Sequence, residues 1–227
     1  MLLSFDTNTE GHTERLAQDI TEMVVAGWAG RDRDAIEHHI DELAAIGVPR
    51  PSKVPLFYRV AASSLTQTEQ IQVLGDQTSG EAEPFVFSLQ GELYVTVASD
   101  HTDRKLEAHS VALSKQICAK PVAHHAWRWR EVREHWGQVR LCSWIQGEDG
   151  EEQYQEGPAG SLVSPEELLD QYLGGRVLPD GLAMSCGTVS VIGAIRPAGS
   201  LKIALHDPVL GRRIEHQYRI NVLPEVA

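Results

Sequence analysis

Short runs of apolar residues, many of them alternating with polar ones, recur along the chain. Strand side chains point to opposite faces in turn, so runs of this kind indicate β-strands. They lie at residues 2–6, 23–26, 54–60, 71–74, 92–100, 139–145, 153–155, 182–186, 201–205 and 214–222. The pattern predicts a protein built mainly of strands.

Helical spacing is clearest over residues 32–45, where Ile36, Ile40 and Leu43 recur every three to four positions and Gly47 follows. Shorter helices are predicted at residues 105–114, 131–136 and 164–170. These segments predict an α+β chain that is mostly β. A chain of 227 residues fits a single domain over 1–227, with strands and a helix in 1–50 and a β-rich body in 51–227.

Three carboxylates are expected to meet within residues 80–122. Glu81 and Glu83 are two apart on a predicted strand and therefore share one face. A turn at Gln90-Gly91 returns the chain along a second strand that ends at Asp100. Like charges held together repel, so the group requires a proton or a cation, and a hard divalent cation with oxygen ligands fits best.

A plain structural interpretation competes with this one. A Glu-x-Glu pair is usually the solvent face of an edge strand, and Pro84 directly after it agrees with an edge. Asp100, the Asp103-Arg104 pair and Lys115 together favour the metal site, with Asp103 and Arg104 outside the ligand set. Lys115, just beyond the predicted helix at 105–114, supplies a cation that suits an anionic substrate.

The same stretch resembles the metal site of the fumarylacetoacetate hydrolase superfamily. Its E-x-E, N-D-x-T-x-R and K-S-F-D-x-x-C-P motifs are matched in order by Glu81-x-Glu83, Ser99-Asp100-His-Thr-Asp103-Arg104 and Ser114-Lys115-x-x-Cys118. Its P-x-L-F-x-K, R-Q-x-G and T-G-T segments are matched by Pro55-Leu56-Phe57, Tyr154-Gln155-Glu156-Gly157 and Cys186-Gly187-Thr188. The departures are Arg59, Ser99 and Ala119-Lys120-Pro121, and they leave the substrate open. The chain is similar to an uncharacterised, domain-of-unknown-function branch of that superfamily.

This resemblance implies a mixed β-sandwich or β-roll like the family's C-terminal domain, with the helix at residues 32–45 as a lid over a catalytic β-roll at 51–227. It implies one Mg²⁺ or Mn²⁺ ion held by Glu81, Glu83 and Asp100, with Lys115 as a catalytic residue.

Substrate contacts are expected from two strands. Tyr58 and Arg59 alternate, so one of them should face the site. Arg59 could clamp a carboxylate or form a surface ion pair. Gly187 and Thr188 follow another strand, where backbone N–H groups and a hydroxyl could hold a substrate oxygen.

His39 and Glu42 are the candidates for activating water. They are three apart on the predicted helix at 32–45 and are therefore neighbours, able to act as a base and its orienting group. A His-x-x-Glu pair has this role in hydrolytic members of the resembled family. The alternative is a solvated helix face, because acidic residues and histidines surround the pair.

Charge and composition limit the classes of molecule that the protein is expected to bind. A net charge of −12 disfavours binding to nucleic acid or an anionic membrane and favours a small-molecule partner. No apolar run is long enough to span a bilayer, and three cysteines without zinc-like spacing fit a reducing cytoplasm. The tryptophans Trp127, Trp129 and Trp136 could form a platform on which nucleic-acid bases stack, but a place in the core or at a dimer interface is the commoner role of such residues. We expect a homodimer.

The function favoured by these observations is a divalent-metal-dependent hydrolase that cleaves a C–C bond in a small 2-oxo or 1,3-dicarbonyl carboxylic acid, through an enolate stabilised by the metal. An oxo-acid decarboxylase, tautomerase or dehydratase on the same scaffold is one alternative. A noncatalytic metal- or ligand-binding relative is another, and its mark would be a solvent-facing Glu81-Glu83 pair with Lys115 far away.

Overall fold

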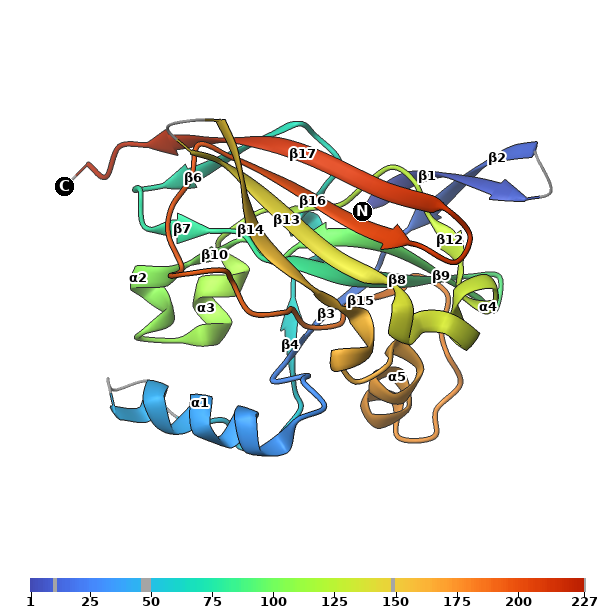
Figure 1. Ribbon diagram of the computed structural model, residues 1–227, viewed down its shortest axis with the longest axis horizontal. Coiled ribbons are helices and arrows are strands. Elements are labelled where there is room, and N and C mark those ends of the chain that lie inside the picture. The colour runs from blue at the N-terminus through green and yellow to red at the C-terminus, as the bar shows by residue number, and fades with distance from the viewer. Residues whose placement is uncertain (10–11, 46–49, 148–149, 227) are drawn as a thin grey trace.

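The computed structural model describes residues 1–9, 12–45, 50–147 and 150–226. Its strands form two main sheets, one behind the other in Figure 1. The first has six strands, in the order β12 (Trp127–Arg128), β9 (Glu92–Ser99), β8 (Ala82–Leu89), β15 (Leu182–Ser185), β3 (Glu22–Gly27) and β4 (Leu56–Val60). The second has five, in the order β14 (Gly150–Pro158), β13 (Arg140–Gly147), β16 (Ser200–Asp207), β17 (Arg212–Leu223) and β6 (Gln70–Leu74).

Three small two-stranded sheets complete the β-structure. They pair β1 (Leu2–Thr9) with β2 (His12–Asp19), β7 (Thr78–Ser79) with β10 (Thr102–Asp103), and β5 (Leu65–Thr66) with β11 (Lys120–Pro121). Most neighbouring strands are antiparallel, but β15 runs parallel to β3, β17 to β6 and β11 to β5. The predicted α+β class, mostly β and with mixed sheets, is confirmed.

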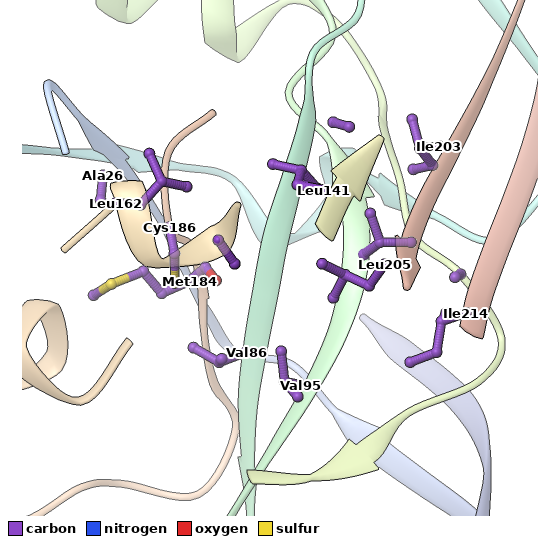
Figure 2. Packing of buried hydrophobic residues seen from close by; sticks show 14 of the residues in the cluster. Ala26, Val86, Val95, Leu141, Leu162, Met184, Cys186, Ile203, Leu205 and Ile214 are labelled. Carbon is purple, nitrogen blue, oxygen red and sulfur yellow. Dashed lines mark hydrogen bonds between the residues drawn. The ribbon is translucent and has the colours of Figure 1, made fainter. Parts of the chain in front are cut away.

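The central core lies between the two main sheets. Val86 and Val95 of the six-stranded sheet pack in one buried cluster with Leu141 and Leu205 of the five-stranded sheet (Figure 2). A second cluster covers the opposite face of the six-stranded sheet, where the ring of Phe5 stacks on Phe87 with centroids 4.1 Å apart. Strand β8 is therefore buried on both faces, which places the carboxylates at its start inside the molecule.

The β1–β2 hairpin is only half predicted by the sequence. Residues 2–6 read as a strand, but the following polar residues read as a turn, whereas the chain continues through β2. Within β2 only Leu16 and Gln18 are buried. One face of the strand is therefore exposed to solvent, and it has too few apolar residues for the sequence pattern to indicate a strand. The hairpin extends beyond the main sheets at the upper right of Figure 1.

Strand β8 lies in the centre of its sheet, contrary to the edge position that Pro84 suggests. It pairs with β9 along its whole length and with β15 at residues 85–87. The carbonyl of Pro84 accepts a hydrogen bond from Cys186 N at 2.9 Å, but proline has no N–H to return one. Pro84 thus marks the end of the β8–β15 ladder, where the chain turns away at Gly187.

The turn between β8 and β9 agrees with the prediction. Gln90 and Gly91 have φ angles of 53° and 75°, the left-handed backbone that two-residue hairpin turns of type I′ use. This turn fixes the register that brings the end of β9 beside the start of β8, with Ala82 opposite Ser99.

Helices lie around the sheets. The predicted helix at 32–45 is α1 (Arg33–Ala45), which lies at the bottom of Figure 1, with Ile36 and Ile40 buried. The helix predicted at 164–170 is α5 (Pro165–Leu173), capped by Ser164, whose Oγ accepts from Glu167 N. The one predicted at 131–136 is replaced by α4 (Trp129–Val132) and a 3₁₀-helix, η2 (Arg133–Gln138).

The single helix predicted at 105–114 is wrong. The chain forms two short helices there, α2 (Arg104–Glu107) and α3 (Val111–Gln116). Ser110 separates them, because its extended backbone and side-chain hydroxyl cap α3 at Leu113 N. Lys115 consequently lies within the last turn of α3 and not beyond the helix.

The tryptophans belong to the core. Trp127, Trp129 and Trp136 are 4–6% exposed and belong to the central cluster, so they form no surface platform for stacking. Within the described residues, no helix is both long and apolar enough to cross a bilayer.

Candidate metal centre

Two strand ends bring three carboxylates together. Glu81 precedes β8, Glu83 lies on it, and Asp100 follows β9. One carboxylate oxygen of each lies within 4.8 Å of the others. The Asp100 N–H donates to the carbonyl of Glu81 at 3.0 Å, so the backbone itself ties the two strand ends. The hairpin register therefore produces the convergence that the sequence predicts.

Two buried lysines hold the carboxylate of Asp100. Lys115 Nζ pairs with Oδ2, and Lys120 Nζ lies 3.0 Å from Oδ1. Burial opposes the charge on Asp100, but both ammonium groups outweigh it and hold the pKa of this carboxyl below its usual range. Burial likewise opposes the charge on Lys115, yet Asp100, Glu81 and Glu83 raise the pKa of Lys115, which stays an ammonium.

Lys120 was not predicted as part of the site. It lies in β11, is 1% exposed, and also donates to the carbonyl of His101. Its neighbours Pro121 and Val122 are buried too, and a lysine in such a place needs an internal partner. The parallel pairing of β11 with β5 places it, and no local pattern in the sequence encodes that contact.

Arg104 holds Glu81 from the other side. Its Nη2 lies 3.2 Å from Glu81 Oε1, its Nη1 pairs with Glu107 at 2.9 Å, and its Nε donates to Ser79 Oγ at 2.7 Å. Asp103 instead caps α2, accepting from Leu106 N at 2.8 Å. The two residues thus support the site and its neighbouring helix.

Glu83 is the one acid of the three without a described ion-pair partner. It is 3% exposed, and its Oε2 has no hydrogen-bond partner among the described residues. Burial, followed by the charge of Asp100, raises the pKa of Glu83 well above its usual value, while Lys115 and the N–H of Gly187 act in the opposite direction. A buried carboxylate oxygen without a partner is expensive, so this atom requires either a proton or a cation.

The donor set fits a hard divalent cation. The charges of three acids are matched by Lys115, Lys120 and Arg104, so neutralisation alone does not demand an ion. Glu83 belongs to the group of three carboxylates, and its buried Oε2, which has no hydrogen-bond partner among the described residues, is the feature that an ion would satisfy. Three oxygen donors of this kind suit Mg²⁺ or Mn²⁺ better than zinc or copper.

The side chains of Tyr58 and Arg59 point to opposite faces of β4, as the alternation of strand side chains requires. The Tyr58 ring lies under Lys115, with Nζ 5.8 Å from the ring centroid. Arg59 is exposed, and its guanidinium lies 3.3 Å from Glu22 and 3.2 Å from the Tyr172 hydroxyl. Tyr58 therefore faces the carboxylate group, and Arg59 forms the surface ion pair that was its alternative role.

Gly187 and Thr188 lie at the end of β15 beside Glu83. Gly187 has a φ of 86°, and a Cβ there would lie 2.7 Å from the Cβ of Ala29, so only glycine fits. The Thr188 hydroxyl donates to the Ala82 carbonyl at 2.6 Å and accepts from Gln155 Nε2 at 2.7 Å. In this arrangement Thr188 anchors the start of β8, and Gln155, buried at 0% exposure, is a supporting residue not assigned from the sequence.

His39 and Glu42 lie on α1, but their side chains fall outside the described part of the chain. Their expected role as base and orienting group therefore stays a prediction. The same holds for the lid movement expected of this helix.

Comparison with known proteins places the chain among relatives of this fold. It belongs to the family described as "Protein of unknown function (DUF2848)", whose model matches residues 26–218. No curated protein matches it in sequence.

Its fold is that of fumarylacetoacetate hydrolase family structures. It is similar to yeast ynq8, a fumarylacetoacetate hydrolase family protein, at 12% identity and a TM-score of 0.62 over 91% of this chain and 95% of that one. It is similar to 2-keto-3-deoxy-D-arabinonate dehydratase complexed with magnesium and 2,5-dioxopentanoate, at 16% identity and a TM-score of 0.64. This match covers 91% of this chain and 75% of the dehydratase chain. A third similar structure is 4-oxalocrotonate decarboxylase from Pseudomonas putida G7 complexed with magnesium and adipate, at 15% identity and a TM-score of 0.59. This match covers 89% of this chain and 78% of the decarboxylase chain.

Proposed function

We propose that this protein is a divalent-metal-dependent enzyme that acts on a small 2-oxo or 1,3-dicarbonyl carboxylic acid, and that its reaction is hydrolysis of a C–C bond. The observation that carries the proposal is the buried, unpartnered oxygen of Glu83 beside Glu81 and Asp100, with Lys115 in contact with the group. A noncatalytic relative was expected to show an exposed acidic pair with Lys115 far away, and the buried cluster does not have that form.

Glu81, Glu83 and Asp100 would hold one Mg²⁺ or Mn²⁺ ion. When bound, such an ion supplies Lewis acidity that polarises a substrate carbonyl. Lys115 would then neutralise the negative charge that develops on the substrate oxygen as an enolate forms. Lys120 pairs with Asp100 and Arg104 pairs with Glu81, and these ion pairs hold the two carboxylates in place. Tyr58 forms part of the wall beside Lys115.

Hydrolysis further requires a water nucleophile, and His39 with Glu42 would supply its base and orienting group. Decarboxylase, dehydratase or tautomerase chemistry on the same enolate is the second candidate. It is favoured by two similar structures, a dehydratase and a decarboxylase, both complexed with magnesium.

Calorimetric titration with Mn²⁺ and Mg²⁺ tests the metal assignment. Asp100→Ala should weaken binding at least about 10-fold, because the affinity of such sites follows the number of charged oxygen ligands. Glu83→Gln is the cleaner variant, since Glu83 has no described ion-pair partner that its loss would strand. Asp76→Ala removes the same charge from an exposed position and should bind as the wild type does. Wild-type affinity in both site variants would refute the assignment.

A further inference from the structure

The pleat of β9 directs Ser99 and Asp100 to opposite faces of the six-stranded sheet. Val95 and Val97 face the central core, and Ser99 continues that row, so Asp100 faces the other side with Glu81 and Glu83. Strand β9 ends at Ser99, and beyond it one backbone hydrogen bond, from the Asp100 N–H to the Glu81 carbonyl, ties Asp100 to the neighbouring strand end. The contacts of its two neighbours, Ser99 and His101, are the further constraint on its position.

Both neighbours of Asp100 contact one tyrosine from the other main sheet. The hydroxyl of Tyr218, on β17, lies 2.8 Å from Ser99 Oγ and 3.0 Å from His101 Nδ1. The second ring nitrogen of His101 lies 2.9 Å from Thr78 Oγ1, and all four residues are buried. This chain of hydrogen bonds joins the segment before Glu81 to the segment around Asp100.

The backbone before Glu81 packs against the same hydroxyl. A Cβ on Gly80 would overlap the Tyr218 hydroxyl and lie 2.6 Å from Ser99 Oγ. Real Cβ atoms do not approach oxygen so closely, so the chain comes this near to Tyr218 only because residue 80 is glycine. Tyr218 is thus the point where both ligand-bearing segments meet the second sheet.

We propose that Tyr218 is a positioning residue that, through Ser99 and His101, holds Asp100 in the place where it binds the divalent cation. The proposal rests on the proposed metal-binding function. It assigns no contact between Tyr218 and the metal or the substrate, because Tyr218 lies on the opposite side of β9 from Asp100.

Tyr218→Phe removes the hydroxyl and keeps the ring. The expected result is an Mn²⁺ dissociation constant raised about 10- to 100-fold, the usual effect of losing a group that orients a ligand. Tyr154→Phe is the matched control, because Tyr154 is also a buried tyrosine, 1% exposed, and its hydroxyl accepts a long 3.4 Å hydrogen bond from Arg196 N. That control should bind Mn²⁺ as the wild type does. Ser99→Ala should weaken binding too, and the double variant should lose less than the sum of the two effects, since both remove the same contact.

An unchanged dissociation constant in Tyr218→Phe, an equal loss in Tyr154→Phe, or fully additive losses would overturn the proposal. If Tyr218→Phe does not fold, Ser99→Ala replaces it under the same criteria.

A wild type that binds no Mn²⁺ would instead refute the metal function. Hydrogen exchange of the Asp100 amide, which donates to Glu81, then decides the positioning role separately. Faster exchange in Tyr218→Phe than in Tyr154→Phe keeps Tyr218 as the residue that positions Asp100 beside its lysines, and equal exchange rejects it.

Discussion

Asp100 shows how neighbouring charges decide the state of a single carboxyl. Fully buried, it would favour its neutral form, but Lys115 and Lys120 contact one oxygen each and keep it ionised. Glu83, also buried and two positions along from Glu81, has no ion-pair partner in the described part of the chain and stays the acid that most needs a metal or a proton. Two buried carboxyl groups in one cluster thus have pKa values shifted in opposite directions, because lysines contact Asp100 and do not pair with Glu83 among the described residues.

Lys115 is predicted to act on the substrate and not on the metal, since an ammonium has donors and no acceptor. Lys115→Met should retain Mn²⁺ binding, because Lys120 still pairs with Asp100. Its kcat on the oxo acid found by screening such acids with Mg²⁺ or Mn²⁺ should fall about 10²- to 10³-fold, as when one donor to a developing oxyanion is lost. Lys105→Met, at an exposed position on α2, is the control. Full activity in Lys115→Met would exclude this role.

Asp207 is predicted to set part of the stability of the fold against acid. This buried residue accepts hydrogen bonds from His135 Nε2 at 3.0 Å and from Leu210 N at 3.2 Å, and it pairs with Arg212. Burial opposes its charge, but these contacts outweigh it and lower the pKa of Asp207. Its stabilisation is therefore present above the unfolded-state pKa of about 3.9 and is lost as pH falls through the folded value.

Asp207→Asn should reduce the free energy of unfolding at pH 7 by about 1–3 kcal/mol, the range for hydrogen bonds to a charged group. The difference in unfolding free energy between the variant and the wild type should shrink as the pH falls below about 4. Urea unfolding across this pH range measures it, with Asp76→Asn as an exposed control. A difference that grows in acid would contradict the sign of the pKa shift.

At the scale of elements, β8 carries most of what positions the site. It is central and buried on both faces, so Glu81 and Glu83 at its start are held by a rigid strand. Helix α1 differs from β8, because it belongs to neither main sheet and lies at the bottom of the molecule in Figure 1. A helix so placed suits the role of a lid that closes over substrate, which stays a prediction.

The pair on α1 is predicted to separate hydrolysis from the other enolate chemistries. If the reaction is hydrolysis, His39→Ala and Glu42→Gln should each reduce kcat about 10²- to 10⁴-fold, the usual contribution of a positioned base. Decarboxylation needs no activated water, so both variants would then stay within a few-fold of wild type. Circular dichroism spectra serve as the folding control. Loss in His38→Ala alone would show that the neighbouring histidine is the base.

At the scale of the whole molecule, a net charge of −12 at a sequence pI near 5.2 disfavours binding to the phosphate backbone of nucleic acids. The small anionic substrate that we propose would have to reach a local group of cations inside an acidic protein. Lys115, Lys120 and Arg104 form that group around the carboxylates.

We expect the chain to form a homodimer in solution. Light scattering coupled to size-exclusion chromatography should give a mass twice the 25.1 kDa of the chain. The mass should stay constant on dilution through the micromolar range, as for a stable interface. A mass of one chain at all concentrations would reject the dimer.

The sequence by itself determined most of the strands, the turn between β8 and β9, and which three acids come together. Alternating apolar residues specify strands, Gln90-Gly91 specifies a tight turn, and a period of two puts Glu81 and Glu83 on one face. These features depend on residues close together in the chain, so local physical chemistry is enough to predict them. The order of the motifs likewise implied the fold that similar structures share.

Tertiary structure alone decided which other residues complete the site. Lys120, Tyr218 and Gln155 reach it from β11, β17 and β14, and no periodicity near them in the sequence marks that contact. It also decided that Tyr58 faces Lys115 while Arg59 pairs with Glu22, and that β8 is central in spite of Pro84. The physical reason is that burial and charge pairing depend on strands distant in sequence, which meet only when the two sheets pack together.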